Sequence, residues 1–258
     1  MTQAAKPTRQ RGIVGLAVIA LIMVSVLTSL GLWQLRRKDE KHALIAALTE
    51  RLAAAPVALP AAAQWASLRP AHDEFLRVTF SATFDAKPDV MVYSSGSAVR
   101  DDVSGPGTWA FLPARLADGR GVVINAGFVQ NTMQDRAQQD RAAARLVTGA
   151  PVTMTGYLRF PEHPGWFTPQ ADTRKRLWFT RDVPAMVQAL GWGPMEQVAP
   201  FYVDLEAPVP PSGVPKPGPL QVRLKDDHLQ YAITWFGLAL VVAATFAFWV
   251  RGRRRGLA

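Results

Sequence analysis

The side chains best suited to chemistry gather at the start of an uncharged run near the carboxyl end of the chain. His228 opens this segment. At about 100° per residue, two aromatic and two small residues share a helical face with its imidazole: Tyr231, Trp235, Ala232 and Ala239. Because imidazole is a common axial ligand of haem iron, this face suits a flat, apolar ligand that contains iron. The alternative is an aromatic belt at a membrane edge, with the histidine facing water.

Aromatic and polar residues also end an earlier uncharged run, at the level that would face His228 in a pair of membrane helices. Trp33 and Gln34 could close the opposite side of the ligand-binding face. Arg37 and Lys41 follow one helical turn apart, where they could meet haem propionates or anionic lipid headgroups. A solvated helix is the alternative for this pair, because exposed charges usually contribute little.

The rest of the chain shows little that could catalyse a reaction. It has no cysteine, which excludes thiol catalysis, Cys-ligated zinc, iron–sulfur clusters and covalent c-type haem attachment. His72 stands beside Asp73 and Glu74 in a turn-like stretch, and we interpret this triplet as solvated. We interpret His163, in a Pro-flanked turn, and His42, among charges, in the same way. The sequence therefore predicts a protein that is not an enzyme.

Two uncharged runs of 20 residues, 13–32 and 231–250, must position these side chains. Each would span about 30 Å as a helix, which is the thickness of a bilayer core. A cleaved signal peptide is the alternative for the first run, but the run is longer than a typical apolar signal region and no A-x-A-like site precedes Trp33. We expect transmembrane helices at residues 13–33 and 229–250.

The distribution of charge predicts the orientation of these helices. Of the 29 Lys and Arg residues, seven lie in tails 1–12 and 251–258, and the remaining 22 nearly balance the 20 Asp and Glu. A nucleic-acid-binding protein would concentrate its excess charge on the folded domain, so nucleic acid is not an expected partner. The positive-inside rule places both tails in the cytoplasm and residues 34–228 in the periplasm. Tail 1–12 lacks the composition of a mitochondrial transit peptide, and we therefore expect a bacterial inner membrane.

The segment between the spans is dominated by alternating apolar and polar residues, which predicts strands. The runs cover residues 76–84, 90–93, 109–116, 122–129, 152–158 and 201–205. Asp118-Gly119 suits a tight hairpin turn between two of them. The fold class expected is membrane-anchored α+β, with two transmembrane helices flanking a mainly antiparallel-β extracytoplasmic domain with a few short helices.

Short helices and linkers complete the expected domain. We expect helices over residues 134–146 and 183–190, the second capped by Asp182 and ended by Gly191, and a continuation of the first span to about Leu52. Residues 53–63 form an Ala/Pro-rich linker. Residues 207–219 contain six prolines, which predicts a semi-extended spacer leading to the membrane.

Two segments carry a resemblance to a known family. Residues 30–35 read LGLWQL and are followed by Arg37, Lys41, Leu44 and Ile45, and residues 228–239 read HLQYAITWFGLA. These segments resemble the opening and closing motifs of the Surfeit locus protein 1 family. Weaker matches fall between them in the family's order, at residues 75–78, 118–120, 125–127 and 156–159.

The resemblance implies an assembly factor for haem–copper cytochrome c oxidase, of bacterial type. Such a protein would bind haem a, with His228 at the position of the family's haem-associated histidine, and help to deliver it. Its partners would be the oxidase's catalytic subunit, the haem a synthesis machinery and the lipid bilayer. The expected haem-binding residues are His228, through the iron, with Tyr231, Trp235, Trp33, Gln34 and Arg37.

Two other classes of protein remain open on the sequence. A cofactor-free scaffold that docks on an oxidase subunit is supported by Ala239, Ala243 and Ala247, because small residues every four positions let another helix approach closely. A membrane-tethered periplasmic enzyme has only scattered histidines in its favour.

Overall fold

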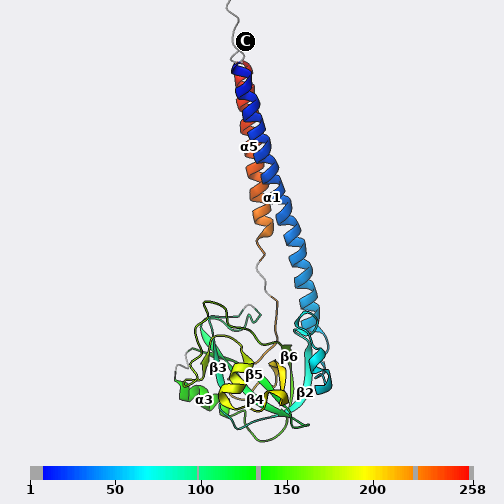
Figure 1. Ribbon diagram of the computed structural model, residues 1–258, viewed down its shortest axis with the longest axis vertical. Helices are drawn as coiled ribbons and strands as arrows, with labels where there is room; N and C mark the ends of the chain where they lie inside the picture. The colour runs from blue at the N-terminus through cyan, green and yellow to red at the C-terminus, as the bar shows by residue number, and fades with distance from the viewer. Residues whose placement is uncertain (1–7, 98, 132–134, 223–225, 256–258) are drawn as a thin grey trace, which may run out of the picture. The chain divides into compact units, whose positions relative to one another are not determined.

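The computed structural model describes residues 8–97, 99–131, 135–222 and 226–255 (Figure 1). The chain divides into two compact units. One is the helix pair, formed by Met1–Ala46 together with Leu224–Ala258, and the other is the domain, Ala47–Arg223.

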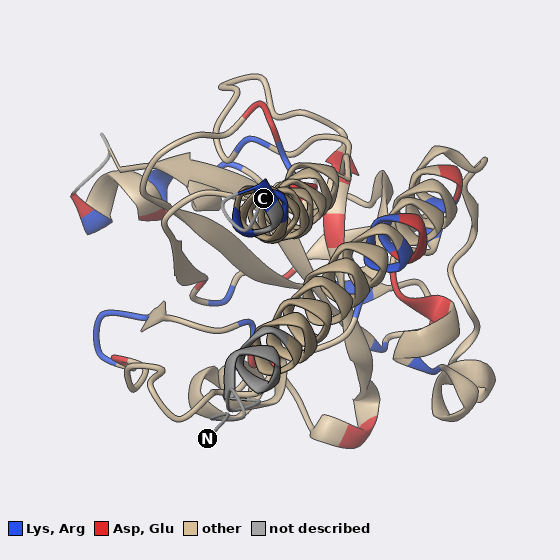
Figure 2. Ribbon diagram, turned by 90° about the horizontal axis from the view of Figure 1, so that it is seen from above, with Lys and Arg blue, Asp and Glu red and all other residues tan. Residues whose placement is uncertain are grey.

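The helix pair consists of α1 (Thr8–Ala53) and α5 (His228–Arg255). In the part of the chain that the structure describes, these two helices are long and apolar enough to cross a membrane, and only 6% of the most apolar stretch of each is buried. Such exposure of aliphatic side chains is unfavourable in water and favourable in a bilayer. The continuation of α1 as a helix to about Leu52 is confirmed. Lys and Arg gather at the end of α5 and beyond the apolar stretch of α1 (Figure 2).

α1 and α5 approach each other closely at Gly31. A Cβ atom at this position would lie 2.6 Å from the ring of Phe236, so a larger residue would require that ring to move or the helices to separate. On the same side of α5, Ala232 and Ala239 are buried. These small residues set the spacing of the helix pair.

The described part of the domain contains an eight-stranded sheet in the order β1-β2-β6-β8-β5-β4-β3-β7. Because β4 also pairs with β2, through Ala82 opposite Leu116, strands β2, β6, β8, β5 and β4 close into a small barrel. The strands are β1 (Val57–Ala58), β2 (Arg77–Phe84), β3 (Val90–Ser94), β4 (Gly107–Leu116), β5 (Gly121–Gln130), β6 (Val152–Arg159), β7 (Leu177–Trp178) and β8 (Val198–Ala207).

The sheet of the described strands is mixed, with antiparallel pairings in the majority, as expected of a mainly antiparallel domain. The pairings β2–β4, β2–β6, β3–β4, β4–β5 and β6–β8 are antiparallel, as the alternating runs suggested. However, β5 and β8 are parallel at the centre of the sheet, and β1–β2 and β3–β7 are parallel at its edges. A parallel pair needs a long crossover, which is supplied here by residues 131–197.

Alternating side chains of the barrel strands explain the expected periodicity. The side chains at every second position point into the barrel and fill it. Its narrow interior favours small residues such as Ala82, Ala110, Ala114 and Ala126. Side chains on the outer face of β4, β5 and β8, together with two from the adjoining strand β3, form a second core under α4 (Val183–Leu190): Val90, Val92, Trp109, Phe111, Val123 and Tyr202.

The sequence predicted two of the short helices correctly. α4 has the expected bounds, with the Asp182 carboxylate accepting a hydrogen bond from the backbone N–H of Ala185 and with Gly191 in the left-handed region. The α3 helix (Arg136–Ala144) lies within the expected range 134–146, of which Gln134 is outside the described residues. Short helical turns that were not expected are η1 (Ala62–Ser67), α2 (Pro70–Asp73) and η2 (Met195–Gln197).

The Pro-rich segment 207–219 is packed on the domain, so its interpretation as a spacer is wrong. Lys216 and Phe128 exchange both backbone hydrogen bonds, at 2.8 and 3.0 Å. Gly127 makes room for this contact, because a Cβ atom there would lie 2.3 Å from the Lys216 carbonyl carbon. Pro215 and Pro217 are buried on either side of Lys216.

Candidate functional site

The candidate site lies in the helix pair, where α5 begins. The Asp226 carboxylate accepts a hydrogen bond from the backbone N–H of His228 at 3.0 Å, and the Asp227 carbonyl accepts one from the N–H of Tyr231 at 3.1 Å. These contacts satisfy donors that the first turn of a helix leaves without partners. The hydrogen bond from the His228 N–H, together with the nearby His42 side chain, lowers the pKa of Asp226. A carboxylate therefore holds His228 at the helix start.

The His228 imidazole contacts Gln34 of α1, with 2.7 Å between Nδ1 and the amide oxygen Oε1. An amide oxygen can only accept a hydrogen bond, so Nδ1 carries the proton in this contact. The lone pair of the neutral ring then lies on Nε2. Metal-binding histidines are commonly fixed in this way, by donating the other ring N–H to a neighbouring oxygen.

A second contact joins the two helices beside the first. His42 Nε2 lies 2.6 Å from the Asp226 carboxylate. The expectation of a solvated His42 is confirmed by its exposed side chain, but the sequence did not indicate that the ring also contacts Asp226. Since His42 follows Gln34 by eight residues, both side chains fall on one face of α1, and helical spacing could have revealed this.

The other expected haem-binding residues are distributed around this contact. Trp235 is half-buried, and its Nε1 is buried with no hydrogen-bond partner among the described residues. The rings of Tyr231 and Trp33 are exposed. Arg37 contacts Glu40 at 2.7 Å on the outer side of α1. The structure thus brings His228 and Gln34 together and leaves Tyr231, Trp33 and Arg37 on open surfaces of the helix pair.

A flat ligand could reach His228 only from its exposed side. The small residues Ala232 and Ala239 are buried in the helix packing, so they do not form an open slot. Tyr231 offers an exposed ring within one turn of His228. No cluster of three or more His, Asp or Glu side chains suited to a metal ion occurs among the described residues. A porphyrin supplies its own nitrogen ligands to iron, so a single histidine that offers one ring nitrogen fits haem better than it fits a bare metal ion.

The domain contains a separate buried polar network, which sequence reasoning missed. The Asp204 carboxylate accepts hydrogen bonds from Asn125, its register partner on β5, at 2.6 Å and from Arg159 on β6 at 2.7 Å. Arg159 also donates to Glu74 at 2.6 Å. The interpretation of Glu74 as part of a solvated triplet is therefore wrong.

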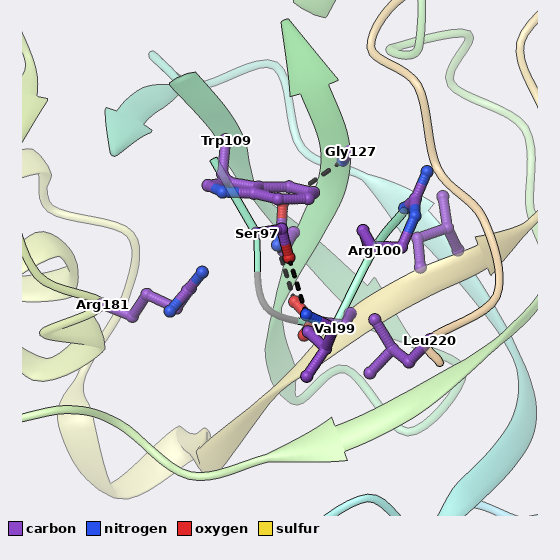
Figure 3. Close-up of a pocket in the computed structure, with 10 residues that line it drawn as sticks. Ser97, Val99, Arg100, Trp109, Gly127, Arg181 and Leu220 are labelled. Carbon is purple, nitrogen blue, oxygen red and sulfur yellow. Dashed lines mark hydrogen bonds between the residues drawn. The ribbon is translucent and has the colours of Figure 1, made fainter. Parts of the chain in front are cut away.

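A small pocket adjoins this network (Figure 3). Arg100, Arg181, Trp109 and Ser97 line it, and the Trp109 Nε1 and Arg181 Nε atoms are buried without hydrogen-bond partners among the described residues. The pocket has a volume of about 10 Å³, which admits about one water molecule. It is therefore a place for a bridging water and is far too small for a haem.

These features define a class of protein: a small closed mixed sheet inserted between two apolar helices, with a histidine fixed at the start of the second helix. Residues 21–240 match the model of the SURF1 family. The chain belongs to the SURF1 family, as its end motifs suggested, and the match includes both Gln34 and His228.

Relatives from distant organisms match most of the chain. It is 33% identical over 246 residues to the SURF1-like protein of Monosiga brevicollis, covering 92% of this chain and 87% of that protein. It is 28% identical over 250 residues to Surfeit locus protein 1 of Homo sapiens, covering 93% and 77%. For Surfeit locus protein 1 of Rattus norvegicus the identity is 28% over 232 residues, covering 86% and 70%.

Proposed function

We propose that this protein is an assembly factor for a haem–copper cytochrome c oxidase, and that it holds haem a for delivery to the catalytic subunit. Membership of the SURF1 family supports the assembly role. The observation that carries the haem-binding role is the 2.7 Å contact of His228 Nδ1 with Gln34, with no hydrogen bond at Nε2 among the described residues. Haem a is the cargo in this proposal, and its iron supplies the coordination site for Nε2.

Each side chain has a defined task in this proposal. Gln34 fixes the tautomer and the orientation of the His228 ring. The exposed ring of Tyr231 packs against the porphyrin, with Trp235 behind it on the same face of α5. Arg37 provides a cation for a haem propionate. It would give up its ion pair with Glu40, which is exposed and therefore contributes little to stability.

A visible absorption spectrum tests whether the chain holds haem. We expect the full chain, purified in detergent from a host that makes haem a, to carry a Soret band in proportion to protein. The matched comparison is the same chain from a host that makes only haem b. A chain that purifies without haem from the first host would favour the alternative, a cofactor-free scaffold. That alternative is supported by the exposure of Ala243 and Ala247 on α5, where a partner helix could pack closely.

The helix pair is proposed to anchor the chain in a bacterial inner membrane, with both termini in the cytoplasm and the domain in the periplasm. The basic residues that follow the apolar part of α5 support this orientation through the positive-inside rule.

Cysteine labelling can test the orientation directly, because the natural chain has no cysteine. In cells with a permeabilised outer membrane, we expect Asp118→Cys, at an exposed turn of the domain, to react with a membrane-impermeant maleimide. Gly252→Cys, near the end of α5, should react only after the inner membrane is opened. The opposite pattern would overturn the orientation, and reaction of both in closed cells would contradict a cytoplasmic tail.

A further inference from the structure

A long loop of the domain, residues 162–181, which includes the two-residue strand β7, exposes two large aromatic side chains. Trp166 and Phe167 are 101% and 100% exposed, whereas Trp109, Trp178 and Trp192 in the same domain are almost completely buried. Fully exposed neighbouring aromatics are unfavourable in water, so they point to a surface that covers them.

The loop is built to present these two residues. The Thr168 N–H donates to the Gly165 carbonyl at 3.0 Å, and the Gly165 N–H donates to the Thr168 hydroxyl at 2.9 Å. These bonds define a turn whose two corner residues are Trp166 and Phe167. The base of the loop is closed by Glu162 and Arg181, with 2.6 Å between carboxylate and guanidinium. The projection of the aromatics is therefore fixed by hydrogen bonds.

A second tip of the same loop carries positive charge. Asp172 and Leu177 exchange both backbone hydrogen bonds, at 2.9 and 3.0 Å, and so close a tight turn. Arg174 and Lys175 are exposed on it, and Lys175 Nζ lies 3.8 Å from the Asp172 carboxylate in a solvent-exposed pair. Arg176, by contrast, binds Asp89 and Asp140 inside the domain. The loop thus combines an apolar tip with a basic tip.

We propose that loop 162–181 inserts Trp166 and Phe167 into the interface of the anchoring bilayer, with Arg174 and Lys175 at anionic headgroups. A bilayer accepts single projecting aromatic side chains and attracts nearby cations. A protein partner usually seals its central aromatic contacts within a surrounding rim, which a two-residue corner does not provide. The proposal rests on the membrane anchoring proposed above, since a tethered loop needs only weak affinity for lipid.

Spin labelling of single cysteines tests this contact. The full chain carrying Phe167→Cys, which keeps Trp166, is labelled with an apolar nitroxide and placed in vesicles of phosphatidylcholine with phosphatidylglycerol. We expect collisions with a water-soluble nickel complex, relative to those with oxygen, to be about tenfold rarer than for a label at Asp118→Cys. Replacing Arg174 and Lys175 with serine, or omitting phosphatidylglycerol, should reduce this protection.

Two further measurements distinguish failure of the loop proposal from failure of the membrane anchoring. A label at Ala243→Cys on α5 reports the membrane anchoring itself. If it shows an oxygen-rich, nickel-poor signature while the label at residue 167 matches that at residue 118, the loop proposal is overturned and the anchoring stands. If the label at residue 243 is also exposed to nickel, the anchoring fails as well. Protection at residue 167 that appears only when the oxidase's catalytic subunit is added would overturn the bilayer as the occupant.

Discussion

We expect the His228→Ala variant to lose at least about tenfold of its bound haem while accumulating in the membrane at the normal level. The imidazole is the proposed iron ligand, and alanine removes it without disturbing the start of α5. The Asp226 carboxylate still accepts the backbone N–H of residue 228, which every residue except proline retains. The measurement is the ratio of Soret to protein absorbance in protein purified from a haem-a-producing host. His72→Ala and His163→Ala, both at exposed positions of the domain, are the matched controls.

A Gln34→Leu variant tests whether haem binding depends on the hydrogen bond from His228 to Gln34 or only on the packing of the side chain at position 34. Leucine has nearly the same size and suits an apolar helix, but it cannot accept the Nδ1–H of His228. We expect haem affinity to fall by about tenfold or more, as when such outer partners of metal ligands are removed, together with a shifted Soret band.

A His228→Ala chain that keeps the normal spectrum would refute the ligation of haem iron by His228 and leave the cofactor-free scaffold as the better account.

The second large effect is expected in the domain, where Arg159→Met should lower the free energy of unfolding by about 3–5 kcal/mol. Burial by itself lowers the pKa of Arg159, but the Asp204 and Glu74 carboxylates raise it above its ordinary value, so the side chain remains charged. Its side chain is 12% exposed. Methionine would leave both carboxylates without their main partner in a place that water hardly reaches. Urea unfolding of the full chain in detergent, followed by tryptophan fluorescence, measures the loss.

Arg115→Met is the matched control for this variant. Arg115 also lies on a barrel strand and pairs with an aspartate, Asp85 at 2.8 Å, but its side chain is 48% exposed. Exposed pairs of this kind contribute about 0–1 kcal/mol. Equal losses for the two variants would contradict the claim that burial makes the Arg159 network important.

The elements that the sequence predicts correctly are those with local causes. α4 is bounded by Asp182 and Gly191, whose roles at helix ends depend on neighbouring atoms only. The alternation of the strands follows from the barrel interior on one side and the second core on the other. Barrel closure and the parallel β5–β8 pair depend on residues far apart in the chain, for which no local pattern exists.

The amino-acid composition of a segment gave the wrong prediction where the contacts of a single residue determined the structure. The six prolines of segment 207–219 do argue against a regular strand. Yet Lys216, between Pro215 and Pro217, retains one N–H and one C=O, and these pair with Phe128. In the helix pair, Gln34 was expected opposite His228, but the charges around His42 concealed its contact with Asp226. Polar composition did not indicate which side chain meets which.

The central place of β8 in the sheet affects how the chain can be made. β8 is the last strand in chain order, yet it lies between β5 and β6. Until residues 198–207 have been synthesised, β5 and β6 each keep an open edge of unpaired backbone groups. Pairing of such distant segments is slow and follows local structure. A premature stop before Val198 therefore yields an unclosed, aggregation-prone fragment that also lacks α5, and no shortened chain of this kind can serve as a smaller version of the protein.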